Sequence, residues 1–458
     1  MAVMDRRCLV SSPLFALSLL VSSPGCGDDG GRNEGGDVLD GIGSIGDDAS
    51  STGTGTSTST STSDDGGIKL DVDNHDVGEV GGCPDGGNGG GGGMGDAFSY
   101  IWVSNSPAGT VSKINTESGI EEARYVAGPG VPDPSRTSVN LLGDAVVVDR
   151  AGGIAKIAVK EDRCNDSNNN GVIDTSQGPG DVRAWGADEC VLWHVPLPSG
   201  GSGVTNQWGP RPVAWEGVDD DGCAIPNPRV WVGWRDSTTG FFRRIDGETG
   251  QITDSVSVPW PGDQWGPYGG ATNKEGDFWV VGWQYGPLVR IDAKSLVPKV
   301  YQIPQPPNGD TQWTYGMALD ADGHPWIAGS ATVYHFNPDT EQWDFVSVPG
   351  GSMRGLMVDK EGRAWVANNG ASRLVEIDTL TKTLANADVP LPGAITPVGI
   401  SIDHDGKIWV VDQGASLAFK VDPDTYQTLL TVSGLVSPYT YSDMTGAGLD
   451  LVTFPPQG

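Results

Sequence analysis

Basic residues are scarce in this chain. Its 458 residues include 28 Lys and Arg against 59 Asp and Glu, which gives a formal net charge of −31 at pH 7. A surface this acidic repels phosphate groups, so the composition argues against nucleic acid or anionic lipid as a partner. We interpret the excess acid as a solubility feature of a protein that works at a cell surface.

Long hydrophobic runs are also rare. The clearest one, Leu14 to Val21, is too short to span a bilayer. Two arginines precede it and the segment SSPGC follows it, so residues 1–26 predict an export signal peptide. Because Cys26 follows a glycine, the segment resembles a bacterial lipobox, and we expect Cys26 to be lipidated. Ordinary secretion and a retained anchor are the alternatives. We expect contact with the membrane only through the lipid.

Cysteines are few. Two of the six fall in the signal segment, which leaves Cys83, Cys164, Cys190 and Cys223. Four cysteines allow three pairings, and export permits disulfides. Cys164 and Cys190 bracket one inserted loop, so we predict that they pair. Cys190–Cys223 is the alternative. In either case we expect Cys83, which lies in the linker, to be free.

Motifs for catalysis are lacking. The five histidines show no metal-ligand spacing, and no Ser-His-Asp, Cys-His or HExxH pattern occurs. His324 lies in a predicted turn and His335 on a predicted strand. The sequence therefore identifies no histidine site.

What the chain does contain is a repeat. Residues 399–428 predict two strands around the turn Asp405-Gly406 and then a third strand. Related segments begin at Leu356, Met317, Gly270 and Arg229. Their anchor tryptophans recur at 48, 47, 39 and 44 residues: Trp231, Trp279, Trp326, Trp365 and Trp409. Several short strands in units of this length predict a β-propeller.

The two ends of the repeat region complement each other. The segment from Phe98 matches a repeat from its tryptophan (Trp102) onward but lacks the first strand. The segment DMTGAGLDLVTF, from Asp443, resembles that missing strand. Pairing it with the N-terminal blade would close the ring and remove free sheet edges. We therefore predict an all-β, seven-bladed propeller over residues 97–458, with the later blades at 136–197 and from about 211, 267, 315, 353 and 397.

A low-complexity segment precedes the propeller. Residues 27–96 are rich in Gly, Ser, Thr and Asp. Such a composition cannot bury enough apolar surface to offset its chain entropy, so we expect a disordered tether.

One insert carries a calcium-type pattern. Within residues 161–190, the segment DSNNNGVID places oxygen ligands at positions 1, 3, 5, 7 and 9 of a loop with Gly171 at the sharp turn. It resembles the calcium loops of dockerins, thrombospondin repeats and EF-hands. Gln177 replaces the acid at position 12, so Asp181 or Asp188 would complete the shell. The alternative is an Asn-rich turn without metal. The predicted ligands of a structural calcium are Asp166, Asn168, Asn170, the carbonyl of Val172, and Asp174.

A second set of tryptophans lies in predicted loops. The segments QWGP, QWGPYGG and QWTYGM precede the first strands of three successive blades, and two further tryptophans follow second strands. Both kinds of loop emerge around one mouth of a propeller's channel. Aromatic faces with a few polar donors suit a glycan or another flat or apolar ligand, although these rings could instead only pack the loops. The candidate residues are Trp208, Trp234, Trp265, Trp283 and Trp313.

The blade motif, seen in VGISIDHDGKIWVVD and YGMALDADGHPWIAG, resembles the streptogramin (virginiamycin B) lyase and NHL-like propeller superfamily. The resemblance covers about residues 98–458 and is specific for fold rather than function. The lipobox, the tether and the Asn-rich loop before WGADEC also resemble surface lipoproteins of myxobacteria-like organisms. The resemblance implies a seven-bladed propeller in a protein of the cell envelope.

The lyases of that superfamily are magnesium-dependent and use a Glu three residues after a blade tryptophan, together with two histidines. The corresponding residues here are Asn105, Trp234, Gly282, Gly329, Asn368 and Asp412. Only Asp412 is acidic, and no histidine follows it. We therefore expect a monomeric binding module for a glycan, small molecule or surface protein rather than an enzyme. A divalent-metal-dependent lyase or hydrolase that uses Asp412 is the alternative.

Overall fold

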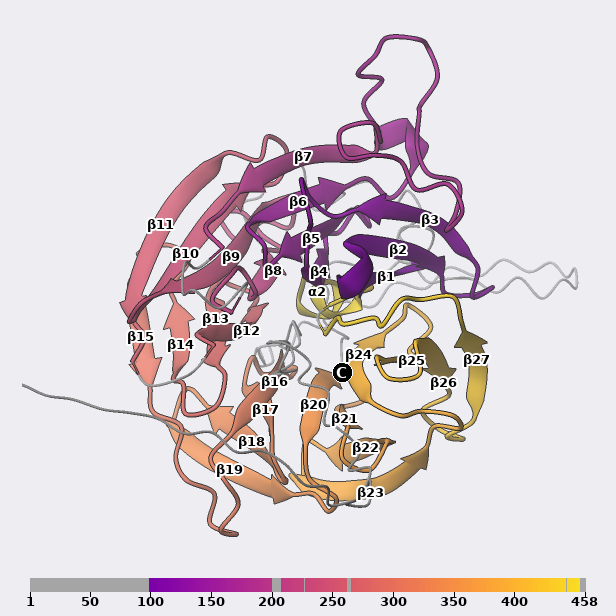
Figure 1. Cartoon of the computed structure of the whole chain (residues 1–458). Coiled ribbons are helices and arrows are strands. Elements are labelled where there is room, and N and C mark those ends of the chain that lie inside the picture. Colours follow the sequence, from indigo (N-terminus) through magenta and orange to yellow (C-terminus); the bar gives the residue numbers. More distant parts are fainter. Residues whose placement is uncertain (1–98, 200–206, 226, 262–264, 442, 454–458) are drawn as a thin grey trace, which may run out of the picture. The chain divides into compact units, whose positions relative to one another are not determined.

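The computed structural model describes residues 99–199, 207–225, 227–261, 265–441 and 443–453. The signal peptide, the lipidation site, the tether and Cys83 lie outside these residues. Within them, seven antiparallel sheets follow one another along the chain and are arranged as the blades of a ring (Figure 1). The predicted seven-bladed propeller is confirmed. Among the described residues, no helix has the length and apolar character needed to cross a membrane.

The first three sheets contain the following strands. The N-terminal sheet has three: β1 (Tyr100–Asn105), β2 (Thr110–Asn115) and β3 (Glu121–Val126). The second has β4 (Pro134–Val139), β5 (Ala145–Asp149), β6 (Gly153–Ile157) and β7 (Val191–Pro196). The third has β8 (Val213–Trp215), β9 (Arg229–Asp236), β10 (Thr239–Asp246) and β11 (Ile252–Pro259).

The last four sheets repeat the same order from the inner to the outer strand. The fourth sheet has β12 (Pro267–Thr272), β13 (Phe278–Gly282), β14 (Leu288–Ile291) and β15 (Pro298–Tyr301), and the fifth has β16 (Thr314–Leu319), β17 (Pro325–Gly329), β18 (Thr332–Asn337) and β19 (Gln342–Ser347). The sixth has β20 (Met353–Val358), β21 (Arg363–Asn368), β22 (Arg373–Asp378) and β23 (Thr383–Pro390). The seventh has β24 (Pro397–Ile402), β25 (Ile408–Asp412), β26 (Leu417–Val421) and β27 (Thr428–Val432). The short 3-10 helices η1 (Ser106–Ala108) and η2 (Glu161–Arg163) follow β1 and β6, and α2 (Ala447–Thr453) ends the described chain.

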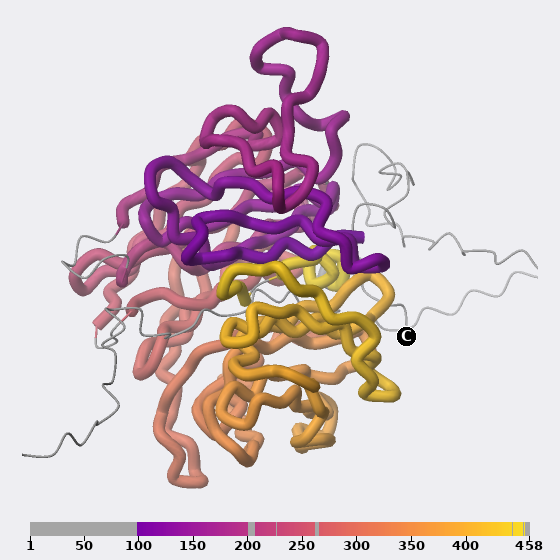
Figure 2. The backbone as a smooth tube through the Cα atoms, turned by 45° about the vertical axis from the view of Figure 1, so that its right-hand side comes forward, coloured from indigo at the N-terminus to yellow at the C-terminus, as the bar shows by residue number. Residues whose placement is uncertain are grey.

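The C-terminal segment closes the ring, as predicted. Tyr439 donates its N–H to the carbonyl of Ser104, and Trp102 donates its N–H to the carbonyl of Met444, both at 2.9 Å. The chain around residues 439–444 therefore lies along the free inner edge of β1, where the first sheet lacks a fourth strand. Figure 2 shows the C-terminal chain beside the N-terminal blade.

The expectation of a strand over DMTGAGLDLVTF is wrong, because residues 443–453 contain no strand. Residues 447–453 form α2 instead. The Asp443 side chain is the reason, because its oxygens accept the N–H groups of Gly446 and Leu449 at 2.8 and 3.1 Å. A carboxylate that receives backbone N–H groups in this way favours a helical start over continued extension.

The anchor tryptophans form the core between blades, as predicted. Each is at most 1% exposed: Trp102, Trp231, Trp279, Trp326, Trp365 and Trp409. The hairpin turns before three of them are also confirmed, since Gly323, Gly362 and Gly406 have φ values of +76°, +76° and +69°. Only glycine adopts this left-handed region without strain.

A buried carboxylate at the end of the innermost strand connects each of these turns to its tryptophan. The Asp403 Oδ2 accepts the indole N–H of Trp409 at 2.9 Å, and the Asp359 Oδ2 accepts that of Trp365 at the same distance. The Oδ1 of each aspartate accepts two turn N–H groups. The repeated Asp therefore determines both the turn and the orientation of the core tryptophan.

Candidate ligand-binding site at the mouth face

The innermost strands begin at one end of the ring, which we call the mouth face. Five of them carry a bulge near their first residue, seen as a shift in the register with the second strand. A bulge leaves a residue out of the ladder and redirects its side chain. Tyr268 in β12, Tyr315 in β16 and Arg354 in β20 occupy these bulged positions. Periodicity in the sequence did not reveal them.

Side chains from non-adjacent blades meet near the axis of the ring. The hydroxyls of Tyr315 and Tyr441 lie 2.8 Å apart, although one residue belongs to the fifth blade and the other to the closing segment. The Arg136 guanidinium of β4 lies 5.3 Å from the Tyr268 ring of β12, across the third blade. All four side chains are 0% exposed. Tyrosine and arginine therefore fill the centre of the ring at the mouth face.

Three of the five predicted tryptophans form a continuous aromatic row. Trp265, before β12, meets Trp283, after β13, edge-to-face with a centroid distance of 6.0 Å. Trp283 meets Trp313, before β16, at 6.1 Å. Trp313 then contacts Tyr315 at 5.0 Å. Trp283 and Trp313 are partly exposed, whereas Trp265 is 6% exposed. We call these three tryptophans the mouth row.

The other two tryptophans do not contact the mouth row through any ring pair among the described residues. Trp234 is 4% exposed, and it packs between the Phe241 ring at 5.8 Å and the Arg243 guanidinium at 4.9 Å. Trp208 lies under the Arg235 guanidinium at 4.9 Å. The contacts of Trp234 indicate loop packing.

Arg354 is a polar member of this candidate site that no sequence pattern indicates. Its guanidinium lies 4.7 Å from the Trp313 ring and 4.3 Å from the Tyr315 ring. Its Nε and Nη1 atoms are buried and have no hydrogen-bond partner within the described part of the chain. The indole N–H groups of Trp265 and Trp283 have none either. Buried donors without partners cost free energy, and four of those found among the described residues belong to Trp265, Trp283 and Arg354.

Asp412 has a structural environment. Its carboxylate accepts the N–H groups of Ile395, Thr396 and Ala415 at 2.7–3.1 Å, and the side chain is 0% exposed. Asn368, at the same position of the preceding blade, also binds loop backbone, through Pro349 and Ala371. This position therefore fixes the loops of the mouth face.

The predicted calcium loop lies in the insert between β6 and β7, which extends outward from the ring (Figures 1 and 2). Asp166 accepts the N–H groups of Asn170 and Gly171, and Gly171 has φ +81°. The Asp174 Oδ2 accepts the side-chain amides of Asn168 and Asn170 at 3.0 and 2.9 Å. Hydrogen bonds thus join the side chains of three predicted ligands, Asn168, Asn170 and Asp174.

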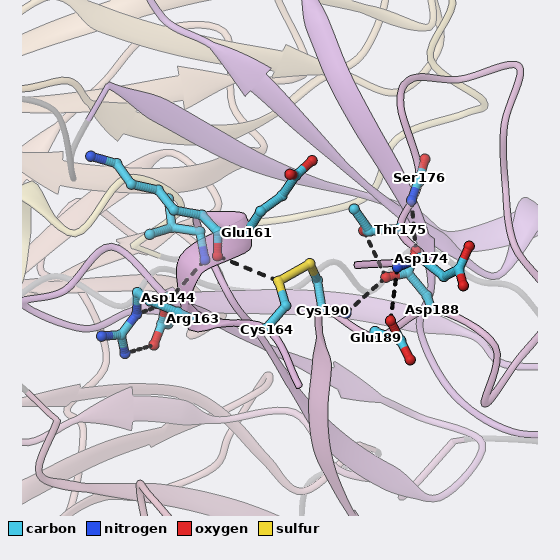
Figure 3. The surroundings of a disulfide bond; sticks show 12 residues. Asp144, Glu161, Arg163, Cys164, Asp174, Thr175, Ser176, Asp188, Glu189 and Cys190 are labelled. Atoms are coloured by element: carbon cyan, nitrogen blue, oxygen red, sulfur yellow. Dashed lines mark hydrogen bonds and ion pairs between the residues drawn. A yellow bond between two sulfur atoms is a disulfide. The ribbon is translucent and has the colours of Figure 1, made fainter. Parts of the chain in front are cut away.

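The two acids expected to complete that shell accept other hydrogen bonds, and the Asp181 Oδ2 accepts the Gln177 N–H at 3.1 Å. Asp188 accepts hydrogen bonds from Thr175 Oγ1 and from the Ser176 N–H at 2.8 and 3.0 Å (Figure 3). Glu189, which lies outside the calcium-type pattern, accepts the N–H groups of Ser167, Asn168 and Asp174. Glu189 therefore fastens the loop to the end of the insert, and calcium binding stays a prediction.

The predicted disulfide is confirmed. Cys164 and Cys190 are bonded, with their Cα atoms 4.4 Å apart, and they join the two ends of the insert (Figure 3). The alternative pairing of Cys190 with Cys223 is therefore wrong. Cys223 is itself disulfide-bonded.

The structure brings together two histidines that the sequence did not identify as a site. The turn residue His324 and the strand residue His335 approach each other, with ring centroids 5.4 Å apart. Asp320 lies beside both, and the ligand atoms of all three residues fall within 4.8 Å of one another. Their separation along the chain concealed this grouping.

Streptogramin B lyases are among the solved structures similar to this chain, as the blade motif led us to expect. Virginiamycin B lyase from Staphylococcus aureus is 14% identical, with a TM-score of 0.46 over 68% of this chain and 89% of the lyase. AztD from Citrobacter koseri is 14% identical, with a TM-score of 0.44 over 74% and 96%. A functionally unknown protein from Desulfotomaculum acetoxidans is 10% identical, with a TM-score of 0.50 over 74% and 96%. Neither a family model nor a curated protein matches the chain. At these identities the shared property is the β-propeller fold.

Proposed function

We propose that this chain is a binding module of the bacterial cell envelope, and that its ligand meets the mouth row and Arg354. The ligand class that fits best is a glycan, or another molecule with a flat or apolar face and a few acceptor groups. A small molecule or surface protein that presents such a face belongs to the same proposal.

The observation that carries the proposal is the combination of aromatic rings and unpaired donors at one place. Trp283 and Trp313 are partly exposed and offer apolar contact. The Arg354 guanidinium beside them has buried N–H groups without partners. Aromatic faces with a small number of donors are typical of sites that bind sugars and other amphipathic molecules. A ligand acceptor at Arg354 would remove the cost of leaving those donors unpaired.

Catalysis at Asp412 has less support. The Asp412 side chain is 0% exposed, and its two oxygens hold the backbone of two loops, so a substrate could reach it only by displacing those loops. We therefore do not propose the lyase or hydrolase alternative for this position.

The direct test is binding of the full chain to an array of glycans and cell-wall fragments. Wild type is compared with Trp283→Ala and Trp313→Ala. Trp343→Ala is the matched control, because this partly buried tryptophan lies on the outer strand β19 of the same blade and packs on Phe336. Selective binding that is lost in both mouth-row variants and kept in the control supports the proposal. A blank array, or binding unaffected by these substitutions, contradicts it.

A further inference from the structure

The group formed by Asp320, His324 and His335 differs from the corresponding positions of other blades, where a buried aspartate contacts a permanent cation. In the last blade, the Asp403 Oδ2 binds the Trp409 indole and also the Lys420 Nζ at 2.7 Å. In the sixth blade, Asp359 binds the Trp365 indole and the Arg363 Nε at 2.7 Å. Each buried carboxylate thus has one indole and one permanent cation.

The fifth blade keeps the carboxylate and the indole, but no Lys or Arg of the described residues forms an ion pair with Asp320. The Asp320 Oδ2 accepts the Trp326 indole N–H at 2.7 Å. His335 pairs with Trp326 in the strand register. In the last blade, Lys420 occupies this position and pairs with Trp409. Four residues after Asp320 stands His324, where the sixth blade has Arg363 four residues after Asp359. Histidines therefore occupy both positions from which other blades supply positive charge.

The orientation of His335 leaves a ring nitrogen facing Asp320. The other ring nitrogen, Nδ1, lies 2.9 Å from the Asp344 Oδ2, and a carboxylate can only accept, so Nδ1 carries the proton of that bond. The Nε2 atom then faces the Asp320 Oδ2 at 3.6 Å. This distance is too long for a hydrogen bond. It is close to the ligand–ligand separation of about 3.3 Å that follows from tetrahedral bonds of about 2.0–2.1 Å to a zinc-type ion.

The second contacts of these residues match those of metal ligands. A histidine that binds a metal usually donates its other ring N–H to a carboxylate, as His335 does to Asp344. Asp320 and His335 are 7% and 2% exposed, and His324 is partly exposed, so an ion could reach the group from the side of the turn. Two imidazoles and one carboxylate favour a divalent transition-metal ion over calcium or magnesium.

We propose that Asp320, His324 and His335 bind one divalent transition-metal ion of the zinc type, with a fourth position open to water. The ion supplies the positive charge that Lys or Arg gives in other blades, and it joins the end of β16, the following turn and β18. The site is independent of the proposed ligand site, because Tyr315 and Asp320 mark opposite ends of β16.

Cobalt(II) absorption of the full chain tests the proposal. The buffer contains excess calcium, which would occupy the predicted calcium loop at Asp166 and keep cobalt out of it. Wild type is expected to develop the intense visible bands of tetrahedral cobalt with one ion per chain, and zinc is expected to displace them. His324→Asn is expected to weaken binding about 100-fold or more, and Asp344→Asn about 10–100-fold through the orientation of His335. His404→Asn, in the equivalent turn of the last blade, is the matched control and is expected to leave binding unchanged.

Circular dichroism confirms that each variant is folded; His324 was chosen because it is partly exposed and does not hold the core tryptophan. The proposal is overturned if wild type gives no tetrahedral cobalt spectrum. It is equally overturned if the spectrum and affinity persist in folded His324→Asn, because the ion then lies elsewhere in the chain.

Discussion

The buried aspartate at the end of an innermost strand is the residue on which each blade depends most. Asp403 is 1% exposed, and it satisfies an indole, a lysine and two backbone N–H groups. Its loss would leave the Lys420 ammonium, which is 8% exposed at its side chain, without its ion-pair partner. A buried charge without compensation is among the most costly defects in a folded protein.

We therefore predict that Asp403→Ala lowers the free energy of unfolding by about 3–5 kcal/mol. The matched control is Glu341→Ala, which removes the partner of Lys299 in a pair whose side chains are both 55% exposed. Its expected cost is below about 1 kcal/mol. Urea unfolding measures both. Equal losses in the two variants would refute the structural role given to the buried aspartate.

The sequence predicted some of these residues well and others not at all. The anchor tryptophans and the turn glycines repeat at blade spacing, and every one of them has the predicted role. The inward position of Tyr268 and Arg354 was not predicted, because a bulge rather than strand alternation directs their side chains. The grouping of His324 and His335 was not predicted, because it depends on the strand register. Only an alignment of one blade with another would have indicated that register.

Among the elements, the closing segment depends on a buried acid. Asp443 is 0% exposed, and burial raises its pKa to about 6. The folded state therefore holds the proton more tightly than the unfolded chain, whose aspartate has a pKa near 3.8. The free energy of unfolding gained from this tighter proton binding is fully present below about pH 3.8 and is lost as pH rises through about 6.

Stability of the wild type relative to Asp443→Asn is the quantity to measure. It is expected to fall by about 1.4 kcal/mol between about pH 5 and about pH 8, since Asn does not ionise. Urea unfolding of both proteins at the two pH values gives the difference. A difference that does not change with pH, or that changes in the opposite direction, would rule out a raised pKa at Asp443.

The insert between β6 and β7 is the second element with a testable property. Calcium bound by Asp166 and its neighbours is expected to protect residues 161–190 from proteolysis, because it fixes a loop whose side chains are largely exposed. Asp166→Ala is expected to abolish this protection. Asp219→Ala is the control, since Asp219 also accepts turn N–H groups but lies outside the calcium pattern. Protection that is independent of calcium, or retained in Asp166→Ala, would favour the metal-free turn.

At the scale of the whole molecule, the two proposed sites lie at opposite ends of the innermost strands. The mouth row and Arg354 lie at the start of the innermost strands, and the proposed metal site lies at their end. The number of blades, their starts and the closure could be predicted, because a repeated pattern with complementary ends determines a ring. The C-terminal helix could not, because one buried side chain, Asp443, ends the extended chain locally.

The location of the protein in the cell is a further prediction at this scale. If Cys26 carries a lipid, the chain is expected in the membrane fraction of a bacterial cell, and Cys26→Ser is expected in the soluble fraction. Detergent extraction and immunoblotting measure the distribution. Identical fractionation of the two proteins would contradict lipid attachment at Cys26.

The central claim is that the mouth row and Arg354 bind a ligand. Isothermal titration of the full chain with the tightest ligand from the array tests it most directly, with Trp313→Ala, Arg354→Gln and the control Trp343→Ala. The account predicts a loss of affinity of about tenfold or more in each of the first two variants, since one aromatic or charged contact contributes about 1.4 kcal/mol. It predicts no change in the control. Equal affinity in all four proteins would show that these residues only pack the loops.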